Sequence, residues 1–145
     1  MTKPMPREVG RLVTLGIVAV ALATGVWAAE APEDLAQAAA EAWLATADRG
    51  DAAATWEQAA KSFQAVVTKE QWQQALAGVR APLGTVSSRK LLSRQFTDKL
   101  PGAPEGKYVV LQYETVFEHK TGVTETVVPM FDADGVWRVS GYFVR

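Results

Sequence analysis

The spacing of apolar residues changes near the middle of the chain. Between Pro32 and Pro82 apolar residues recur three or four positions apart, and after Gly84 they alternate with polar residues. The first spacing is typical of helices and the second of strands with one buried face. The sequence therefore predicts an α+β domain in which three N-terminal helices pack on a curved four-stranded antiparallel sheet.

Three helices are expected from their end signals. The first begins at Pro32 and ends at Gly50, the second is capped by Asp51 and closes at Val67, and the third begins at Thr68. Gln71 is placed to complete a capping box with Thr68, and Pro82 ends the third helix. The apolar faces are predicted to carry Leu35, Ala39, Ala42 and Trp43, then Trp56, Ala60 and Phe63, then Trp72, Leu76 and Val79.

Four strands are expected after Gly84. They cover residues 86–96, 107–119, 123–131 and 136–144, with a Pro- and Gly-rich loop at 101–106 and a hairpin turn at 132–135. Strict alternation in the last strand places Trp137, Val139, Gly141 and Phe143 on one face. Gly141 in mid-strand is a candidate for a bend or bulge.

The N-terminus has the pattern of a signal peptide. Lys3, Arg7 and Arg11 precede a charge-free apolar run at 12–23, and Val26-Trp27-Ala28 fits a cleavage site after Ala28. An uncleaved anchor is the alternative, but about 12 residues of helix span roughly 18 Å of the roughly 30 Å bilayer core. We therefore expect a signal peptide at 1–28, a single domain at 29–145, and a periplasmic or secreted product.

Composition limits the partners and the chemistry. Residues 29–145 hold 12 basic and 15 acidic residues, a net charge of about −3, which argues against nucleic acid or an anionic membrane as partner. The chain has no Cys, which removes lipoprotein acylation, disulfides and thiolate metal sites. His119 is its single histidine and is expected in a solvated hairpin. Asp132-x-Asp134 lacks the later ligands of a calcium loop, so neither a metal nor a cofactor is expected.

Six residues are candidates for lining a small-molecule pocket: Trp43, Trp56, Arg89, Tyr113, Glu125 and Trp137. For the four aromatic residues the competing interpretation, filling the core, is favoured because large aromatics dominate small cores. Alternation allows Arg89 and Glu125 on either face. Facing inward they would have to pair with each other or with a ligand, and the outward orientation of ordinary surface charges is favoured.

A homodimer is a further possibility. Tyr108, Val110, Val116, Val128 and Tyr142 would make one sheet face more apolar than a solvated face should be, so it could pair with a second copy. Cover by loops or by the N-terminal segment is the alternative, and the pattern does not decide between them.

Several short motifs together resemble the domain of unknown function 4019 family of bacterial exported proteins. They are Trp43-Leu44, Asp48-x-Gly50-Asp51, Gln71-Trp72, Arg80-x-Pro82-Leu83-Gly84, Ser88-Arg89-Lys90, Leu100 to Tyr108, Glu125-Thr126-Val127 and Asp134-Gly135-x-Trp137-Arg138. The resemblance implies a bacterial origin and a cone-like fold of the cystatin or nuclear-transport-factor-2 type. It implies no activity, because the family has none established.

The function expected from these observations is that of a non-enzymatic exported module that binds a small apolar ligand or a protein. The alternative is a small cone-fold enzyme of the isomerase or hydratase type acting on an apolar substrate, with Glu114 or Glu125 beside a tyrosine as the acid–base group.

Overall fold

The computed structural model describes residues 2, 4 and 28–145, so nearly all of the predicted signal peptide lies outside the described residues. The elements are α1 (Pro32–Asp48), α2 (Ala52–Glu57), α3 (Lys61–Val66), α4 (Lys69–Arg80), β1 (Val86–Thr97), β2 (Tyr108–Phe117), β3 (Lys120–Phe131) and β4 (Trp137–Val144). Within this described part, no helix is long and apolar enough to cross a membrane.

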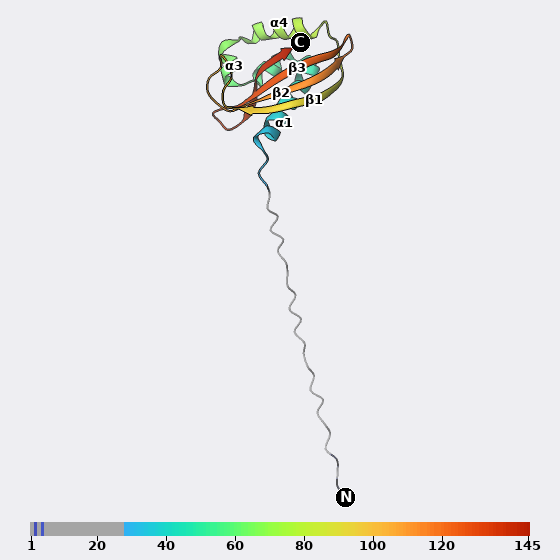
Figure 1. The fold of residues 1–145 in the computed structure, drawn as a ribbon, viewed down its shortest axis with the longest axis vertical. Helices are drawn as coiled ribbons and strands as arrows, with labels where there is room; N and C mark the ends of the chain where they lie inside the picture. Colours follow the sequence, from blue (N-terminus) through green and yellow to red (C-terminus); the bar gives the residue numbers. More distant parts are fainter. Residues whose placement is uncertain (1, 3, 5–27) are drawn as a thin grey trace.

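The four strands form one antiparallel sheet in the order β1-β2-β3-β4 (Figure 1). Each strand pairs with the next along the chain, as short connections favour. Helix α1 packs on all four strands, whereas α4 packs mainly on α2. The α+β class and the four-stranded antiparallel sheet are therefore confirmed.

The second expected helix is divided, so the described residues contain four helices rather than three. Between α2 and α3, Ala60 has an extended backbone (φ −58°, ψ 148°) and its N–H donates to the carbonyl of Val139 at 2.8 Å. The next N–H, of Lys61, donates to the carboxylate of Asp132 at 3.3 Å. The chain leaves the helical path here because the edge of β4 and its hairpin supply hydrogen-bond acceptors for these two amides.

The predicted ends of the first and third helices match the structure. Pro32 occupies the first turn of α1, and Thr68 and Gln71 form the complete capping box of α4. Asp51 caps α2 by accepting from the N–H of Ala54. Thr68, Gln71 and Asp51 hold as signals because they satisfy backbone groups at the helix ends, and Pro32 holds because a first-turn residue needs no N–H donor.

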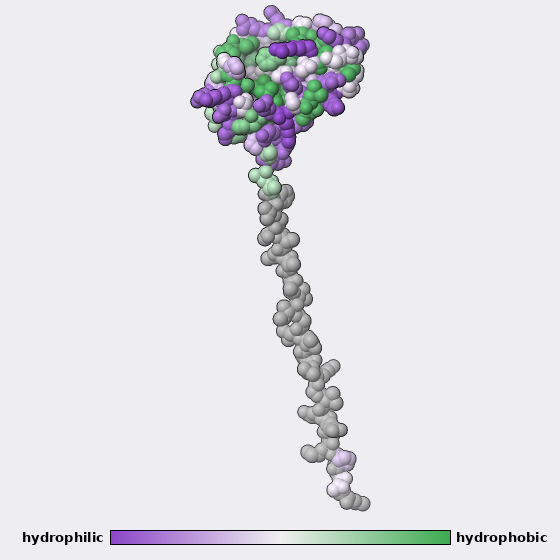
Figure 2. Space-filling view, in the orientation of Figure 1, coloured by the Kyte–Doolittle hydropathy of each residue, from purple (hydrophilic) through white to green (hydrophobic). Residues whose placement is uncertain are grey.

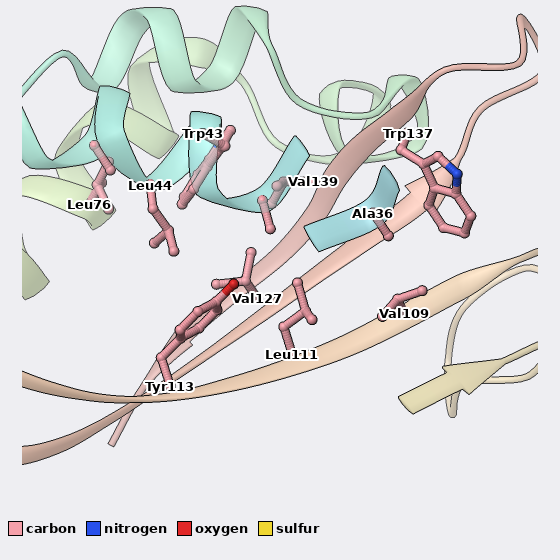
Figure 3. Packing of buried hydrophobic residues seen from close by; sticks show 12 residues of the cluster. Ala36, Trp43, Leu44, Leu76, Val109, Leu111, Tyr113, Val127, Trp137 and Val139 are labelled. Atoms are coloured by element: carbon pink, nitrogen blue, oxygen red, sulfur yellow. The ribbon is translucent and has the colours of Figure 1, made fainter. Parts of the chain in front are cut away.

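The main core lies between α1 and the sheet (Figure 3). Small residues on α1 let its backbone approach the strands, and one large aromatic ring, Trp43, fills the remaining space. The strands contribute branched residues from the face that points at the helix. The central members are Ala36, Ala40, Trp43, Leu44, Val109, Leu111, Tyr113, Val127 and Val139, all at most 3% exposed.

A β-bulge in β4 changes which residues face the helices. The register shifts so that Val128 opposes Gly141 and Pro129 opposes Val139, leaving Ser140 as the extra residue, its hydroxyl donating to the carbonyl of Val128 at 2.9 Å. Beyond the bulge, Tyr142 faces the helices and packs against Trp43, with the ring planes tilted by 56° and the centroids 5.1 Å apart. The predicted alternation is therefore wrong after Val139.

The same bulge reduces the face predicted for a homodimer. Tyr142 lies on the helix side, and Tyr108 is covered by the β1–β2 loop, where its hydroxyl donates to the carbonyl of Pro104. Phe143, 58% exposed, packs over Gly141 on the outer face. Polar and apolar residues are interspersed over the side of the molecule in Figure 2.

Candidate functional site: a buried polar network beneath an open cavity

One polar residue from each strand lies in a row across the helix-facing side of the sheet. Arg89 comes from β1, Thr115 from β2, Glu125 from β3 and Tyr142 from β4. The ends of two helices complete the row, with Asp48 from α1 and Arg80 from α4. We call these six residues the polar network.

Glu125 is the centre of the polar network and is fully buried. Its Oε1 accepts from the Nε of Arg89 at 2.8 Å and from the hydroxyl of Thr115. Its Oε2 accepts from the hydroxyl of Tyr142, and the Nη1 of Arg80 lies 3.8 Å away. Burying a carboxylate costs several kcal/mol unless donors and an opposite charge replace water, and here both do.

Asp48 connects the polar network to the two helix ends. Its carboxylate accepts two hydrogen bonds from Arg89, at 2.8 and 3.0 Å, and one from Arg80 at 2.6 Å. The pair with Arg89 has the bidentate geometry that is the strongest form of this contact. Because Arg89 also binds Glu125, it bridges an acid on α1 and an acid on β3.

The electrostatic surroundings hold these groups in defined protonation states. Burial would raise the pKa of Asp48, but hydrogen bonds from Arg89 and Arg80 outweigh it and lower the pKa. Burial would lower the pKa of Arg89, but hydrogen bonds to Asp48 and Glu125 raise it. Burial, and then the negative charge of Glu125, raise the pKa of Tyr142. Tyr142 therefore stays a hydroxyl donor at physiological pH.

An open cavity of about 300 Å³ shares two wall residues, Asp48 and Arg80, with this network. It opens between the C-terminal ends of α1 and α4, the start of α2, and the segment that leads into β1. Most of its wall is made of small or apolar residues, and the charged residues in the wall are Asp48 and Arg80. The lining is Ala47, Asp48, Gly50, Ala52, Leu76, Ala77, Arg80, Ala81, Gly84 and Thr85.

Arg80 points its guanidinium inward rather than into the cavity. It lies over the buried ring of Phe117 at 5.1 Å, donates to the hydroxyl of Tyr142 at 3.3 Å, and pairs with Asp48. Its side chain is 11% exposed, whereas that of Asp48 is 27% exposed. The carboxylate of Asp48 is therefore the more accessible charge in the cavity wall.

The structure divides the six predicted site residues into two groups. Trp43, Tyr113 and Trp137 lie in the main core, and Trp56 is partly buried with its indole N–H donating to the carbonyl of Val67 at 2.8 Å. None of the six is among the residues that line the cavity. Arg89 and Glu125 point inward and bind each other, so the favoured expectation of outward surface charges is wrong.

Sequence reasoning missed four members of the polar network as site residues: Asp48, Arg80, Thr115 and Tyr142. Thr115 alternates in phase with the buried Tyr113 and Phe117, a signal that was available. Strict alternation placed Tyr142 on the outer face, because it does not account for the bulge at Ser140. Asp48 and Arg80 looked like ordinary charges at helix ends, and no local pattern predicts that two separate helix ends meet.

The position of Glu125 bears on the acid–base role that the alternative function would give it. No group of three metal-ligating side chains occurs in the part of the chain that the structure describes. Both oxygens of Glu125 are occupied by donors within the network, and this carboxylate has no exposed surface. A general base must reach the proton that it removes, so Glu125 as placed is a structural group.

Comparison with known proteins identifies the family of the chain. The model of the family described as "Protein of unknown function (DUF4019)" matches residues 39–142, which include all six members of the polar network. Comparisons with curated proteins and with solved structures gave no match. The chain belongs to the DUF4019 family of proteins of unknown function.

Proposed function

We propose that this chain is an exported, non-enzymatic module that binds a small ligand in the cavity between α1, α4 and the start of β1. The observation that carries the proposal is the cavity of about 300 Å³ with a mainly apolar wall and one accessible carboxylate. Small-molecule sites are typically concave, mostly apolar, and equipped with a few fixed polar groups. The curved sheet and its helices would then act as a cone-like container whose open end is this cavity.

The polar network supports the proposal because it connects elements that surround the cavity. It ties the last residue of α1 to the last residue of α4 through Asp48 and Arg80, and ties both to the sheet through Arg89. Helix α4 has few other connections to the strands. A preformed site loses less conformational entropy on binding than one that must order itself.

The size of the cavity limits the ligand. A volume of about 300 Å³ corresponds to about ten water molecules in the liquid, or a ligand of on the order of ten non-hydrogen atoms. At about 0.3 kcal/mol per atom, such a ligand would gain about 3 kcal/mol, and small ligands often exceed this efficiency. We therefore expect dissociation constants of several millimolar or tighter.

Export is supported by the sequence of residues 1–28 and places the module in the periplasm or outside the cell. The mature protein should begin at Ala29 or Glu30, which N-terminal sequencing of the exported material measures. Membrane-bound material that retains Met1 would contradict this part of the proposal.

The binding function is tested with a set of neutral, cationic and anionic compounds of about ten non-hydrogen atoms, titrated to millimolar concentration. We expect at least one to shift amide resonances of Gly50, Leu76 and Gly84, which surround the cavity. Ala77→Leu should block it, because Ala77 is an exposed residue of the cavity wall. Ala75→Leu is the matched control, since Ala75 is exposed on the same helix but outside this wall. Absence of any saturable shift would refute the proposal.

A further inference from the structure

Three features in or beside the cavity carry a negative charge or a partial negative charge. Asp48 is its accessible charge, the helices that end at its rim present their carbonyl ends, and a second carboxylate lies beside its wall. Together they bear on the chemical class of the ligand, provided that the proposed binding function is correct.

The C-terminal ends of two helices are the first source of negative potential at the cavity. Helices α1, of 17 residues, and α4, of 12 residues, both end at the cavity, with Asp48 and Arg80 as their last residues. The C-terminal end of a helix carries a partial negative charge of roughly half an elementary charge, from carbonyls without helical partners. Two such ends at one cavity favour a cation or a hydrogen-bond donor.

Carboxylates are the second source. Asp48 accepts one hydrogen bond at Oδ2 and two at Oδ1, so Oδ2 retains acceptor capacity. Glu118 lies beside the wall residues Gly84 and Thr85, where its Oε2 is 3.4 Å from the hydroxyl of Thr85. It is exposed and adds a negative charge near the mouth that solvent partly screens.

The cations of this region are already engaged. Arg80 and Arg89 balance Asp48 and Glu125 within the polar network, and the guanidinium of Arg80 faces inward over Phe117. Arg49, just beyond α1, donates to the hydroxyl of the buried Thr46. The polar network is thus balanced in charge. Outside it, Glu118 and the two helix ends are negative, whereas Arg49 keeps its positive charge because its partner Thr46 is neutral.

We propose that the cavity binds a small amphipathic amine, with its apolar body against Leu76 and the alanines and its ammonium group at Asp48. An ammonium donates three hydrogen bonds, and Oδ2 of Asp48, a residue of the cavity wall, retains capacity to accept one of them. A carboxylate ligand would instead meet acceptors and partial negative charge.

The test compares three probes with the same 3-phenylpropyl body: 3-phenylpropylamine, 3-phenylpropan-1-ol and 4-phenylbutanoate. Each is titrated into protein purified after expression of the full chain, and amide shifts of the cavity wall are followed. We expect the amine to bind about tenfold more tightly than the alcohol, as a charged hydrogen bond provides. We expect the carboxylate to bind most weakly. Raising the salt from about 0.02 to 0.5 M should weaken only the amine.

Two variants test the charges. Glu118→Gln should weaken the amine severalfold and leave the alcohol unchanged, because Glu118 is exposed and outside the apolar wall. Asp48→Asn should remove most of the preference for the amine. If Asp48→Asn does not fold, Glu118→Gln and the salt series still show whether the cavity prefers the amine.

The outcomes separate the two proposals. Equal binding of amine and alcohol, or tighter binding of the carboxylate, would overturn the amine proposal while the binding function stands. Failure of all three probes, together with failure of the wider compound set, would overturn the binding function itself.

Discussion

Replacing Arg89 by methionine tests the central claim that Glu125 is a buried charge held by the polar network. The substitution keeps an apolar stem of similar length but removes the guanidinium, which makes one hydrogen bond to Glu125 and two to Asp48. Glu125 would then depend on two hydroxyls and on Arg80 at 3.8 Å. Asp48 would keep Arg80 and has partial access to water.

The expected loss of stability comes mainly from Glu125, which is buried, rather than from Asp48, which keeps Arg80 and some access to water. Removing one partner of a buried ion pair costs about 3 to 5 kcal/mol, because an uncompensated charge stays buried. A domain of this size has a free energy of unfolding of about 5 to 15 kcal/mol, so the loss is a large fraction of it. In equilibrium urea unfolding followed by circular dichroism, the midpoint should fall by about 2 M at an unchanged slope.

Arg94→Met is the matched control on the same strand. Arg94 pairs with Asp34 at the surface, where the side chains are 38% and 51% exposed, so its removal should cost less than about 1 kcal/mol. The double variant Arg89→Met with Glu125→Leu removes both buried charges and should be more stable than Arg89→Met alone. The reasoning would be refuted if Arg89→Met cost no more than Arg94→Met, or if the double variant were the less stable one.

Two further predictions concern acid and the turn before β1. Burial would raise the pKa of Asp48, but hydrogen bonds from Arg89 and Arg80 lower it below its ordinary value of 3.8. The stabilisation that Asp48 provides is therefore complete above about pH 3.8 and is lost as the pH falls further. The urea midpoint should therefore drop as the pH falls below about 3.8, and Asp48→Asn should flatten this part of the profile. Gly84→Ala should destabilise more than Gly50→Ala, as thermal unfolding would measure. Both glycines have a φ near +76°, but only at Gly84 would the new Cβ meet Glu118, at 2.8 Å; equal losses would contradict this.

The elements that the sequence predicted well are those fixed by local chemistry. Thr68 and Gln71 form a capping box from residues three apart, and Asp132 to Gly135 turn the chain within four residues. The period-two pattern of β2 also held, because that strand has helices on one face and solvent on the other. In each case the signal and the structure that it specifies lie within one short segment.

The features that were missed depend on contacts between distant segments. The break at Ala60 exists because β4, about 80 residues later, offers the carbonyl of Val139. The extra residue Ser140 reverses the facing of Tyr142, and an alternation pattern contains no information on such a shift. Glu125 was placed outward because charged residues are mostly exposed, although it stands in phase with the apolar Val123 and Val127.

Asp48 belongs to both the polar network and the cavity wall, so the proposed ligand binding would be linked to folding through it. A ligand that binds only the folded protein stabilises it in proportion to the logarithm of its concentration over the dissociation constant. If Arg89 holds Asp48 in place for the ligand, Arg89→Met must lower ligand affinity as well as stability. If instead the network serves only to bury Glu125, the folded Arg89→Met protein must bind the ligand as the original chain does. Comparing ligand affinity at a urea-free, fully folded condition therefore distinguishes a network that shapes the site from one that only stabilises the sheet.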